Sequence, residues 1–339
     1  MNVDIDQMLQ RLGGSCLKGR GLLCIHDLTN DELAALLDLA AVLKEKKKAH
    51  TRGNLLGGKN IAMVFEKMST RTRSATVVAV ADEGGMTEFL GAGEIHLGKK
   101  ESVKDTARVL GRMFDGILFR GFKHKTVEVL ADLSGIPVWN GLTDESHPTQ
   151  ALADLQTIQE TFGRLKALKV VYVGDGRNNV ANSLMAGCVK MGMDFVNCTP
   201  PQLYPRADLV AKAEDVAAQT GGKVSIVHDP VRAVKGANVI YTDVWVSMGE
   251  ESKWQERIDM LWPYQVNMDM MQHTGNLDKN QVIFLHCLPA FHDNHTEATR
   301  ESGALEVTDE VFEAPFSRVF DQAENRVHTL KAVIVASLA

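Results

Sequence analysis

The chain has 339 residues, and its content of 45% hydrophobic and 24% charged residues is ordinary for a globular protein. This length predicts two domains or one large domain. The formal net charge is −6 and the isoelectric point about 6.0, which argues against nucleic acid as a partner and favours a small ligand.

The five cysteines include no Cys-x-x-Cys pair. An odd number of unpaired cysteines indicates free thiols in a reducing compartment, not a disulfide framework or a zinc site. The N-terminus lacks the basic and apolar regions of a signal peptide and the Arg- and Ser-rich composition of a transit peptide, and no apolar run reaches the roughly 18 residues that span a membrane. We therefore expect a cytoplasmic protein with no membrane partner.

The first predicted helix begins at Thr29, which is followed by Glu32 in the spacing of a capping box. Its amphipathic pattern continues to about Lys46. The lysines at 44 and 46–48 are expected to form its exposed C-terminal end. Before this helix, residues 22–25 have the pattern of a strand.

Apolar runs then alternate with helical patterns along the rest of the chain. Strands are predicted at 61–65, 87–90, 116–119, 137–139, 169–173, 194–197, 224–227, 239–242 and 282–285. Helices are predicted at 74–81, 102–114, 126–133, 151–161, from 178 onward, at 209–219 and at 326–338, with a loop at 140–150. This alternation predicts an α/β fold of two doubly wound parallel-sheet domains of similar size that meet near residue 150. The last helix has no strand of its own and must pack on something already folded.

Three hydroxyls and two guanidinium groups occur within the five residues 69–73, between a predicted strand and a predicted helix. A helix start directs free backbone N–H groups and the positive end of the helix dipole at one point. Together with Arg71 and Arg73, this arrangement suits a dianionic phosphate. The alternative is a capped helix with two solvated arginines.

Two further polar groups follow strands of the same predicted sheet. Arg120 comes directly after the strand 116–119, and His147 and Gln150 lie in the loop after 137–139. Ligands of open parallel sheets bind beyond the carboxyl ends of the strands. With Thr72, these side chains would form an oxyanion-stabilising set for acyl transfer. The alternative is a surface arginine and a histidine in a loop turn.

In the second half of the chain, Gly174-x-Gly176 follows a strand and resembles a dinucleotide-binding turn. Asn179 takes the position of the third glycine, however, and Asn197 stands where an acidic ribose ligand is expected. An NAD-dependent dehydrogenase is therefore a weakly supported alternative. Asn179 could instead bind a carboxylate through its side-chain amide.

The strands 239–242 and 282–285 are also followed by reactive groups. Asp243 could pair with a substrate ammonium, supported by Ser247 and the backbone of Met248; the alternative is a helix cap and a turn. Cys287 follows His286, but neighbouring strand residues point to opposite sides, so His286 is badly placed to activate the thiol. One histidine and one cysteine are too few ligands for zinc. We expect Cys287 to contact substrate and expect no metal.

These motifs together resemble those of a known family. Ser69-Thr70-Arg71-Thr72-Arg73, His147-Pro148-Thr149-Gln150 and His286-Cys287-Leu288-Pro289 are similar to the signature motifs of the aspartate/ornithine carbamoyltransferases. Asp243 with Ser247-Met248-Gly249 resembles the branch that acts on ornithine. The resemblance runs in order from about residue 59 to 332.

The resemblance implies a reaction, a domain arrangement and an assembly. Residues 1–150 plus 318–339 would bind carbamoyl phosphate, residues 151–317 would bind L-ornithine, and the final helix would pack on the first domain. The carbamoyl group would pass to the side-chain amine, giving citrulline and phosphate without a cofactor. The protein would form a homotrimer, or a stack of trimers, with active sites at subunit interfaces.

The resemblance also implies roles for individual residues. The carbamoyl phosphate-binding residues would be Ser69, Thr70, Arg71, Thr72, His96 (from the neighbouring subunit), Arg120, His147, Gln150, Cys287, Leu288 and Arg326. The ornithine-binding residues would be Asn179, Asp243, Ser247 and Met248, and the catalytic residues Thr72, Arg120, His147 and Cys287. Like charge from Arg71, Arg120 and His147 would help to deprotonate the attacking amine.

Several alternatives remain open at this level. The accepting amine could be putrescine, an N-acylated ornithine or aspartate, although the loop 247–249 argues against these. A non-catalytic relative is a third possibility, against which the complete set of polar site residues speaks. The motifs do not distinguish a biosynthetic from a degradative direction.

Overall fold

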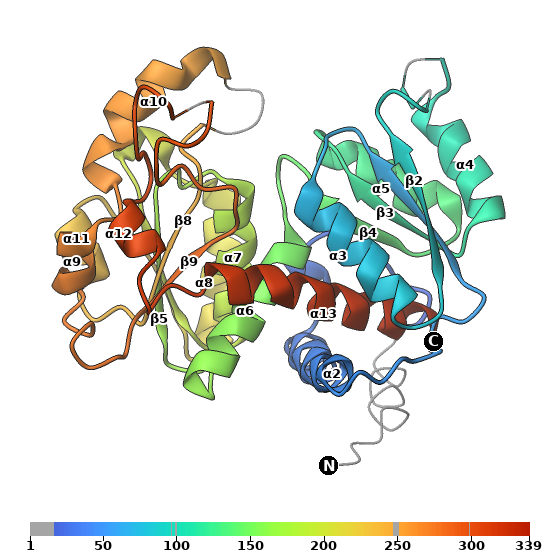
Figure 1. Cartoon of the computed structure of the whole chain (residues 1–339), viewed down its shortest axis with the longest axis horizontal. Coiled ribbons are helices and arrows are strands. Elements are labelled where there is room, and N and C mark those ends of the chain that lie inside the picture. The colour runs from blue at the N-terminus through green and yellow to red at the C-terminus, as the bar shows by residue number, and fades with distance from the viewer. Residues whose placement is uncertain (1–16, 96, 99, 247–250, 298) are drawn as a thin grey trace. The chain divides into compact units, whose positions relative to one another are not determined.

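The computed structural model describes residues 17–95, 97–98, 100–246, 251–297 and 299–339. The chain divides into two compact units, residues 1–156 with 324–339 and residues 157–323. Each unit is built on one parallel sheet, which confirms the predicted fold class (Figure 1). Among the described helices, none has the length and apolar character to cross a membrane.

The sheet of the first unit has the strand order β2-β1-β3-β4. Its strands are β1 (Asn60–Phe65), β2 (Met86–Gly91), β3 (Gly116–Arg120) and β4 (Val138–Leu142). Its helices are α2 (Asn30–Lys48), α3 (Thr70–Ala81), α4 (Val103–Met113), α5 (His124–Ser134), the first part of α6 (Pro148–Phe162) and most of α13 (Val319–Leu338), with the short 3-10 helix η1 (Ile25–Asp27).

Helices cover both faces of this sheet because its strands are apolar on both sides. Ala62, Val64, Ile117 and Phe119 alternate with residues of the opposite face and form a core with Leu110 of α4 and with α5. On the other side, Trp139 of β4 donates a hydrogen bond to Ser337 of α13. Buried strands of this kind are typical of parallel sheets.

The second unit contains a five-stranded sheet in the order β7-β6-β5-β8-β9. Its strands are β5 (Lys169–Val173), β6 (Asp194–Cys198), β7 (Lys223–Val227), β8 (Val239–Thr242) and β9 (Ile283–His286). Its helices are α7 (Asn179–Lys190), α8 (Ala207–Thr220), α9 (Pro230–Val234), α10 (Trp254–Leu261), α11 (Met268–His273) and α12 (Asp309–Phe312), with η2 (Pro201–Leu203), η3 (Glu251–Lys253) and η4 (Trp262–Tyr264).

Three local predictions are wrong in informative ways. Residues 22–25 form one bridge, from Leu22 to Trp139, followed by η1. Lys44 is not exposed but buried, and it donates to Asn325 Oδ1 at 2.8 Å. The predicted loop 140–150 is shorter, because α6 already begins at Pro148, a residue that suits the first helical position since that position needs no N–H.

The predicted capping box is confirmed. Glu32 N donates to the Thr29 hydroxyl and Thr29 N donates to the Glu32 carboxylate, at 3.1 and 2.7 Å. The predicted C-terminal helix is longer than expected, since α13 begins at Val319. Its packing against the first unit is confirmed by hydrogen bonds from Arg326 to Gln150 and from Lys331 to Asp82.

Candidate active site

The predicted phosphate-binding residues lie at the start of α3. Ser69 is the N-cap of this helix, and its hydroxyl oxygen accepts a hydrogen bond from Thr72 N at 3.2 Å. Thr70 is exposed and Arg71 is half-buried in the first turn, where free N–H groups and the helix dipole favour an anion. The helix cap and the predicted anion-binding position thus coincide at Ser69.

Arg120, His147 and Gln150 lie at the same edge of the first sheet. Arg120 is the last residue of β3, which pairs with the end of β1. His147 directly precedes α6, and Gln150 lies in its first turn. The first unit therefore brings these predicted residues to the carboxyl ends of β3 and β4, where α/β folds bind ligands.

Arg326 of α13 connects this edge to the helices around it. Its Nη1 donates to Gln150 Oε1 at 2.7 Å, and its Nη2 donates to Thr72 Oγ1 at 3.1 Å and to Thr149 Oγ1 at 3.2 Å. Arg326 is buried. Because the Thr72 oxygen accepts this bond, the hydroxyl keeps its own hydrogen to donate to a ligand.

His147 is neutral in this environment. Burial, together with the charges of Arg326, Arg120 and Arg71, holds the pKa of its imidazole well below the usual range. This lowered pKa argues against the expectation that His147 adds like charge beside an amine. A neutral imidazole retains one N–H, so His147 can still donate a hydrogen bond to a carbonyl oxygen.

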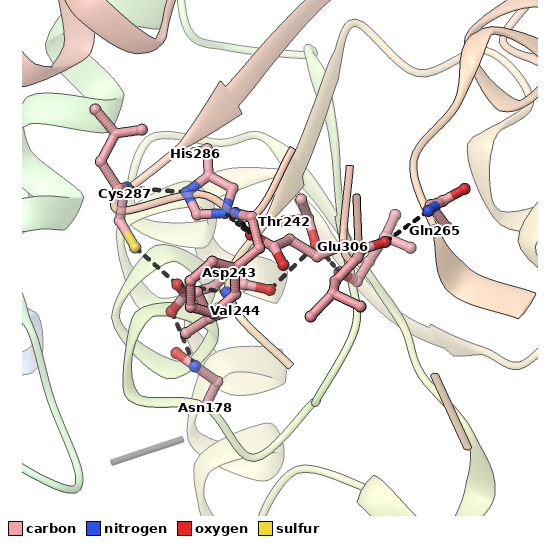
Figure 2. Close-up of polar contacts among 12 residues, drawn as sticks. Asn178, Thr242, Asp243, Val244, Gln265, His286, Cys287 and Glu306 are labelled. Atoms are coloured by element: carbon pink, nitrogen blue, oxygen red, sulfur yellow. Dashed lines mark hydrogen bonds and ion pairs between the residues drawn. The ribbon is translucent and has the colours of Figure 1, made fainter. Parts of the chain in front are cut away.

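In the second unit, the carboxylate of Asp243 is held by three donors (Figure 2). Val244 N and Cys287 Sγ donate to its Oδ1 at 2.8 and 3.0 Å, and Asn178 Nδ2 donates to its Oδ2 at 2.9 Å. Asp243 directly follows β8, so this cluster also lies at the carboxyl end of its sheet. Asn179, a predicted carboxylate ligand, is the first residue of α7.

The surroundings of Asp243 are acidic. Burial, together with Asp243, Asp175, Cys287 and Glu306, raises the pKa of the Tyr172 hydroxyl well above its usual range. The sign of this field is opposite to that around His147. An acidic, buried cluster suits an ammonium group, whereas the first unit suits an anion.

The side chains of His286 and Cys287 lie close together, contrary to the expectation that they point to opposite sides, but both ring nitrogens of His286 face other groups. Leu288 N donates to His286 Nδ1 at 2.9 Å, and His286 Nε2 lies 3.2 Å from Glu306 Oε1, so the ring proton is on Nε2 and faces Glu306 (Figure 2). Leu288 adopts a positive φ of 57°, an unfavourable conformation for leucine. Non-glycine residues in this region concentrate at functional sites.

The glycine turn after β5 has a structural reason unrelated to a dinucleotide. A Cβ at Gly176 would lie 2.7 Å from Leu203 O and 2.9 Å from Asn197 Oδ1, so protein atoms occupy the close approach. Asn197 Nδ2 donates to Gly176 O at 3.2 Å. Gly176, which suggested a dinucleotide turn, and Asn197, which argued against one, therefore bind each other.

Within the described ranges, two groups of three side chains have metal-binding atoms close together, Asp243 with His286 and Cys287, and His292 with Asp293 and Asp309. In the first group, the two ring nitrogens of His286 already face Leu288 N and Glu306. In the second group, His292 Nδ1 lies 2.7 Å from Asp309 Oδ1, an ordinary hydrogen-bond distance. The absence of a metal or cofactor stays a prediction.

The predicted site residues His96, Ser247 and Met248 lie outside the described residues. Their roles stay predictions.

Two family models cover nearly the whole chain. One, described as the carbamoyl-P binding domain of aspartate/ornithine carbamoyltransferase, matches residues 20–160, and one described as its Asp/Orn binding domain matches residues 166–337. The chain belongs to the aspartate/ornithine carbamoyltransferase family.

Similar members of this family match the chain over nearly the whole length of both sequences. A protein named "Ornithine carbamoyltransferase, catabolic" from Bacillus licheniformis is 57% identical, over 95% of this chain and 97% of its own. One of the same name from Streptococcus pyogenes serotype M1 is 54% identical over 95% and 96%. The solved ornithine carbamoyltransferase from Pyrococcus furiosus superposes with a TM-score of 0.88 at 46% identity, covering 95% of this chain and 98% of that one.

Two residues near the candidate site of the second unit were not predicted from the sequence. Asn178, which bonds to Asp243, carried a detectable signal, because asparagine before a helix is a common N-cap. Glu306, which accepts from His286 and from Phe291 N, carried none, because it lies 20 residues from the histidine.

Proposed function

We propose that this chain transfers the carbamoyl group of carbamoyl phosphate to the side-chain amine of L-ornithine, giving L-citrulline and phosphate. Identities of 54–59% to proteins named ornithine carbamoyltransferase, over 95% of the chain, carry this assignment. The opposite fields of the two units support it, since carbamoyl phosphate is an anion and ornithine carries an α-ammonium group.

Carbamoyl phosphate binds to the first unit. Ser69, Thr70 and Arg71 bind the phosphate through hydroxyls, the guanidinium group and the N–H groups of the α3 start. Thr72, Arg120 and His147 donate to the carbonyl oxygen, and Gln150 and Arg326 complete the set. Removing one donor to a developing oxyanion typically lowers the rate by roughly 100- to 1,000-fold.

Ornithine binds to the second unit. Asp243 pairs with its α-ammonium group, Asn179 with its carboxylate, and Ser247 and Met248 complete the site. Cys287 and Leu288 contact the substrates beside Asp243. Holding both ends of the amino acid orients its side-chain amine for attack.

The chain's residues supply positioning and charge, and the substrate supplies the nucleophile. A lysine-like amine has a pKa of about 10.4 and must first lose a proton. The amine attacks the carbonyl carbon of carbamoyl phosphate, whose phosphate group and carbonyl oxygen are bound by arginines. The positive charge of these arginines lowers the pKa of the amine. The first proton of the ammonium group passes to solvent before attack. A bond then forms from the amine nitrogen to the carbonyl carbon, the bond from that carbon to the phosphate oxygen breaks, and a second proton from the nitrogen leaves with the phosphate.

A substrate panel tests the assignment. We expect citrulline from ornithine, and little product from putrescine, N-acetylornithine or aspartate. Arg71→Ala and Arg120→Ala are expected to abolish turnover in a folded protein, as judged by circular dichroism. Near-normal citrulline synthesis by either variant would sink the assignment of the first unit.

We also propose that the protein forms a homotrimer, or a stack of trimers, in which His96 reaches the site of the neighbouring subunit.

We further propose that the reaction runs in the degradative direction in the cell, where citrulline and phosphate are the substrates. The word "catabolic" in the names of the Bacillus relatives supports the direction. A solved relative from Campylobacter jejuni named as anabolic is less similar, with 34% identity.

A further inference from the structure

Asn178 uses both ends of its side-chain amide. As the N-cap of α7, its Oδ1 accepts a hydrogen bond from Val180 N at 2.7 Å. Its Nδ2 donates to Asp243 Oδ2 at 2.9 Å (Figure 2). Asn178 and Asp243 are 8% and 7% exposed, so neither bond competes strongly with water.

This side chain connects two elements that each carry a proposed ornithine ligand. Asn179 begins α7, and Asp243 follows β8, which pairs with β5. The cap fixes where α7 starts and therefore where Asn179 lies. The amide fixes the plane of the Asp243 carboxylate, because Val244 N and Cys287 Sγ both approach the other oxygen, Oδ1.

We propose that Asn178 is a positioning residue for the amino-acid substrate, which orients the Asp243 carboxylate toward the α-ammonium group and holds Asn179 in register with it. This inference rests on the proposed function and assigns Asn178 no contact with substrate. The Asn178 amide carries no charge, so it holds the Asp243 carboxylate without neutralising its negative charge.

Two substitutions separate the donor from the cap. Serine and aspartate are both good N-caps, so Asn178→Ser and Asn178→Asp retain the bond from Val180 N and lose the amide donor. A hydrogen bond to a charged group contributes enough to change binding by roughly tenfold or more. We therefore expect Asn178→Ser to raise the KM for ornithine by roughly tenfold, with the KM for carbamoyl phosphate and the Tm almost unchanged.

In Asn178→Asp, the pH dependence of the KM for ornithine gives a second test, because a purely structural role would not change it. Two adjacent carboxylates share one proton, and this proton can take the place of the amide N–H. As the pH rises the proton is lost and the carboxylates repel each other. We expect the ratio of variant to wild-type KM for ornithine to rise with pH, while the same ratio for Asn178→Ser stays flat.

Asn267 provides a matched control in the same unit. It caps α11 by accepting a hydrogen bond from Met270 N, and among the residues that the structure describes its side chain bonds to none of the predicted site residues. Asn267→Ser should leave both KM values at the wild-type level.

The outcomes distinguish this inference from the function on which it rests. A wild-type protein that makes no citrulline would refute the proposed function. An active wild type with an unchanged ornithine KM in Asn178→Ser would refute the positioning role alone. Equal rises in both KM values, or a fall in Tm that accounts for the lost activity, would also overturn it.

Discussion

Among the individual residues, His147 has a charge that depends on its neighbours. An isolated imidazole is half-protonated near pH 6.5. Buried among Arg71, Arg120 and Arg326, His147 stays neutral at that pH. Burial and the same three cations that suit an anionic substrate therefore favour the uncharged form of this histidine, which can still donate a hydrogen bond.

This environment predicts a pH dependence of stability. Below about pH 6.5 the unfolded chain takes up a proton on His147 that the native state does not, so stability falls as the pH falls. Between pH 7 and pH 5 this histidine contributes at most about 2 kcal/mol. Urea unfolding at several pH values should show a shallower fall for His147→Gln than for the wild type; parallel curves would contradict the neutral assignment.

Asp243 predicts a selective loss of ornithine binding. Asp243→Asn keeps the shape but removes the charge that we propose pairs with the α-ammonium group. The KM for ornithine should therefore rise roughly 100-fold, while that for carbamoyl phosphate stays near wild type. Steady-state kinetics with each substrate varied in turn measures both. If carbamoyl phosphate affinity collapsed and ornithine affinity did not, the division of roles would be wrong.

Asp175→Asn is the control for that change. Asp175 is also buried in the acidic cluster, but Arg177 pairs with both of its oxygens, at 3.0 and 2.7 Å. Its charge is therefore already compensated, and its removal should affect ornithine much less.

At the level of helices and strands, α13 is held to the first unit by buried polar contacts. Lys331, which is 2% exposed, donates to Asp82 Oδ2 at 2.8 Å, and Lys47 of α2 donates to the same oxygen at 2.7 Å. Asp82 therefore joins the end of α3 to both α2 and α13. Ionic contacts of this kind are costly to break from one side, because the partner's charge stays buried.

The Lys331 contact predicts an asymmetry between its two partners. Asp82→Ala should destabilise the protein by about 2 kcal/mol, a value reduced for the partial exposure of Asp82, because Lys331 loses its counter-charge. Lys331→Met, which removes the buried charge and keeps the volume, should cost less than about 1 kcal/mol. Denaturant unfolding compares the two.

An exposed ion pair on α2 serves as the reference. Glu45 and Lys48 are both largely exposed, so Glu45→Ala should change stability by less than about 0.5 kcal/mol. If Lys331→Met proved more harmful than Asp82→Ala, the buried lysine would have a role beyond this pair.

Across the molecule, the electrostatic fields at the carboxyl ends of the two sheets have opposite signs. The pKa of His147 is lowered in the first unit, and the pKa of Tyr172 is raised in the second. A chain with a net charge of −6 therefore contains a local cationic site. We expect the field of the first unit to attract an anion and that of the second unit to attract an ammonium group.

The proposed assembly predicts a particle mass. Sedimentation equilibrium should give a multiple of three chains of 37.2 kDa, and a monomer at enzymatically active concentrations would refute the trimer. A dodecamer-sized particle with sigmoidal saturation by carbamoyl phosphate would support the degradative direction. Hyperbolic saturation by a simple trimer would speak against it.

Much of the fold follows from local patterns. Alternating strands and helices predicted two parallel sheets, and the strand 169–173 has the predicted bounds, because a buried parallel strand is a continuous apolar run. The capping box at Thr29 and Glu32 was readable because its two bonds join residues three apart. The site motifs were readable because their polar groups directly follow apolar strands.

Local sequence patterns were therefore enough to predict most of the secondary structure, the fold class, the family and the sheet edges at which the proposed site residues lie. Tertiary packing determined what those groups bond to: Arg326 with Thr72 across 254 residues, Lys44 with Asn325 across 281, and Asn178 with Asp243. It also made His147 neutral. The reason is physical, since burial and the charge of a neighbour depend on distance in space, and local sequence patterns carry no information about side chains that meet only after the sheets and helices have packed.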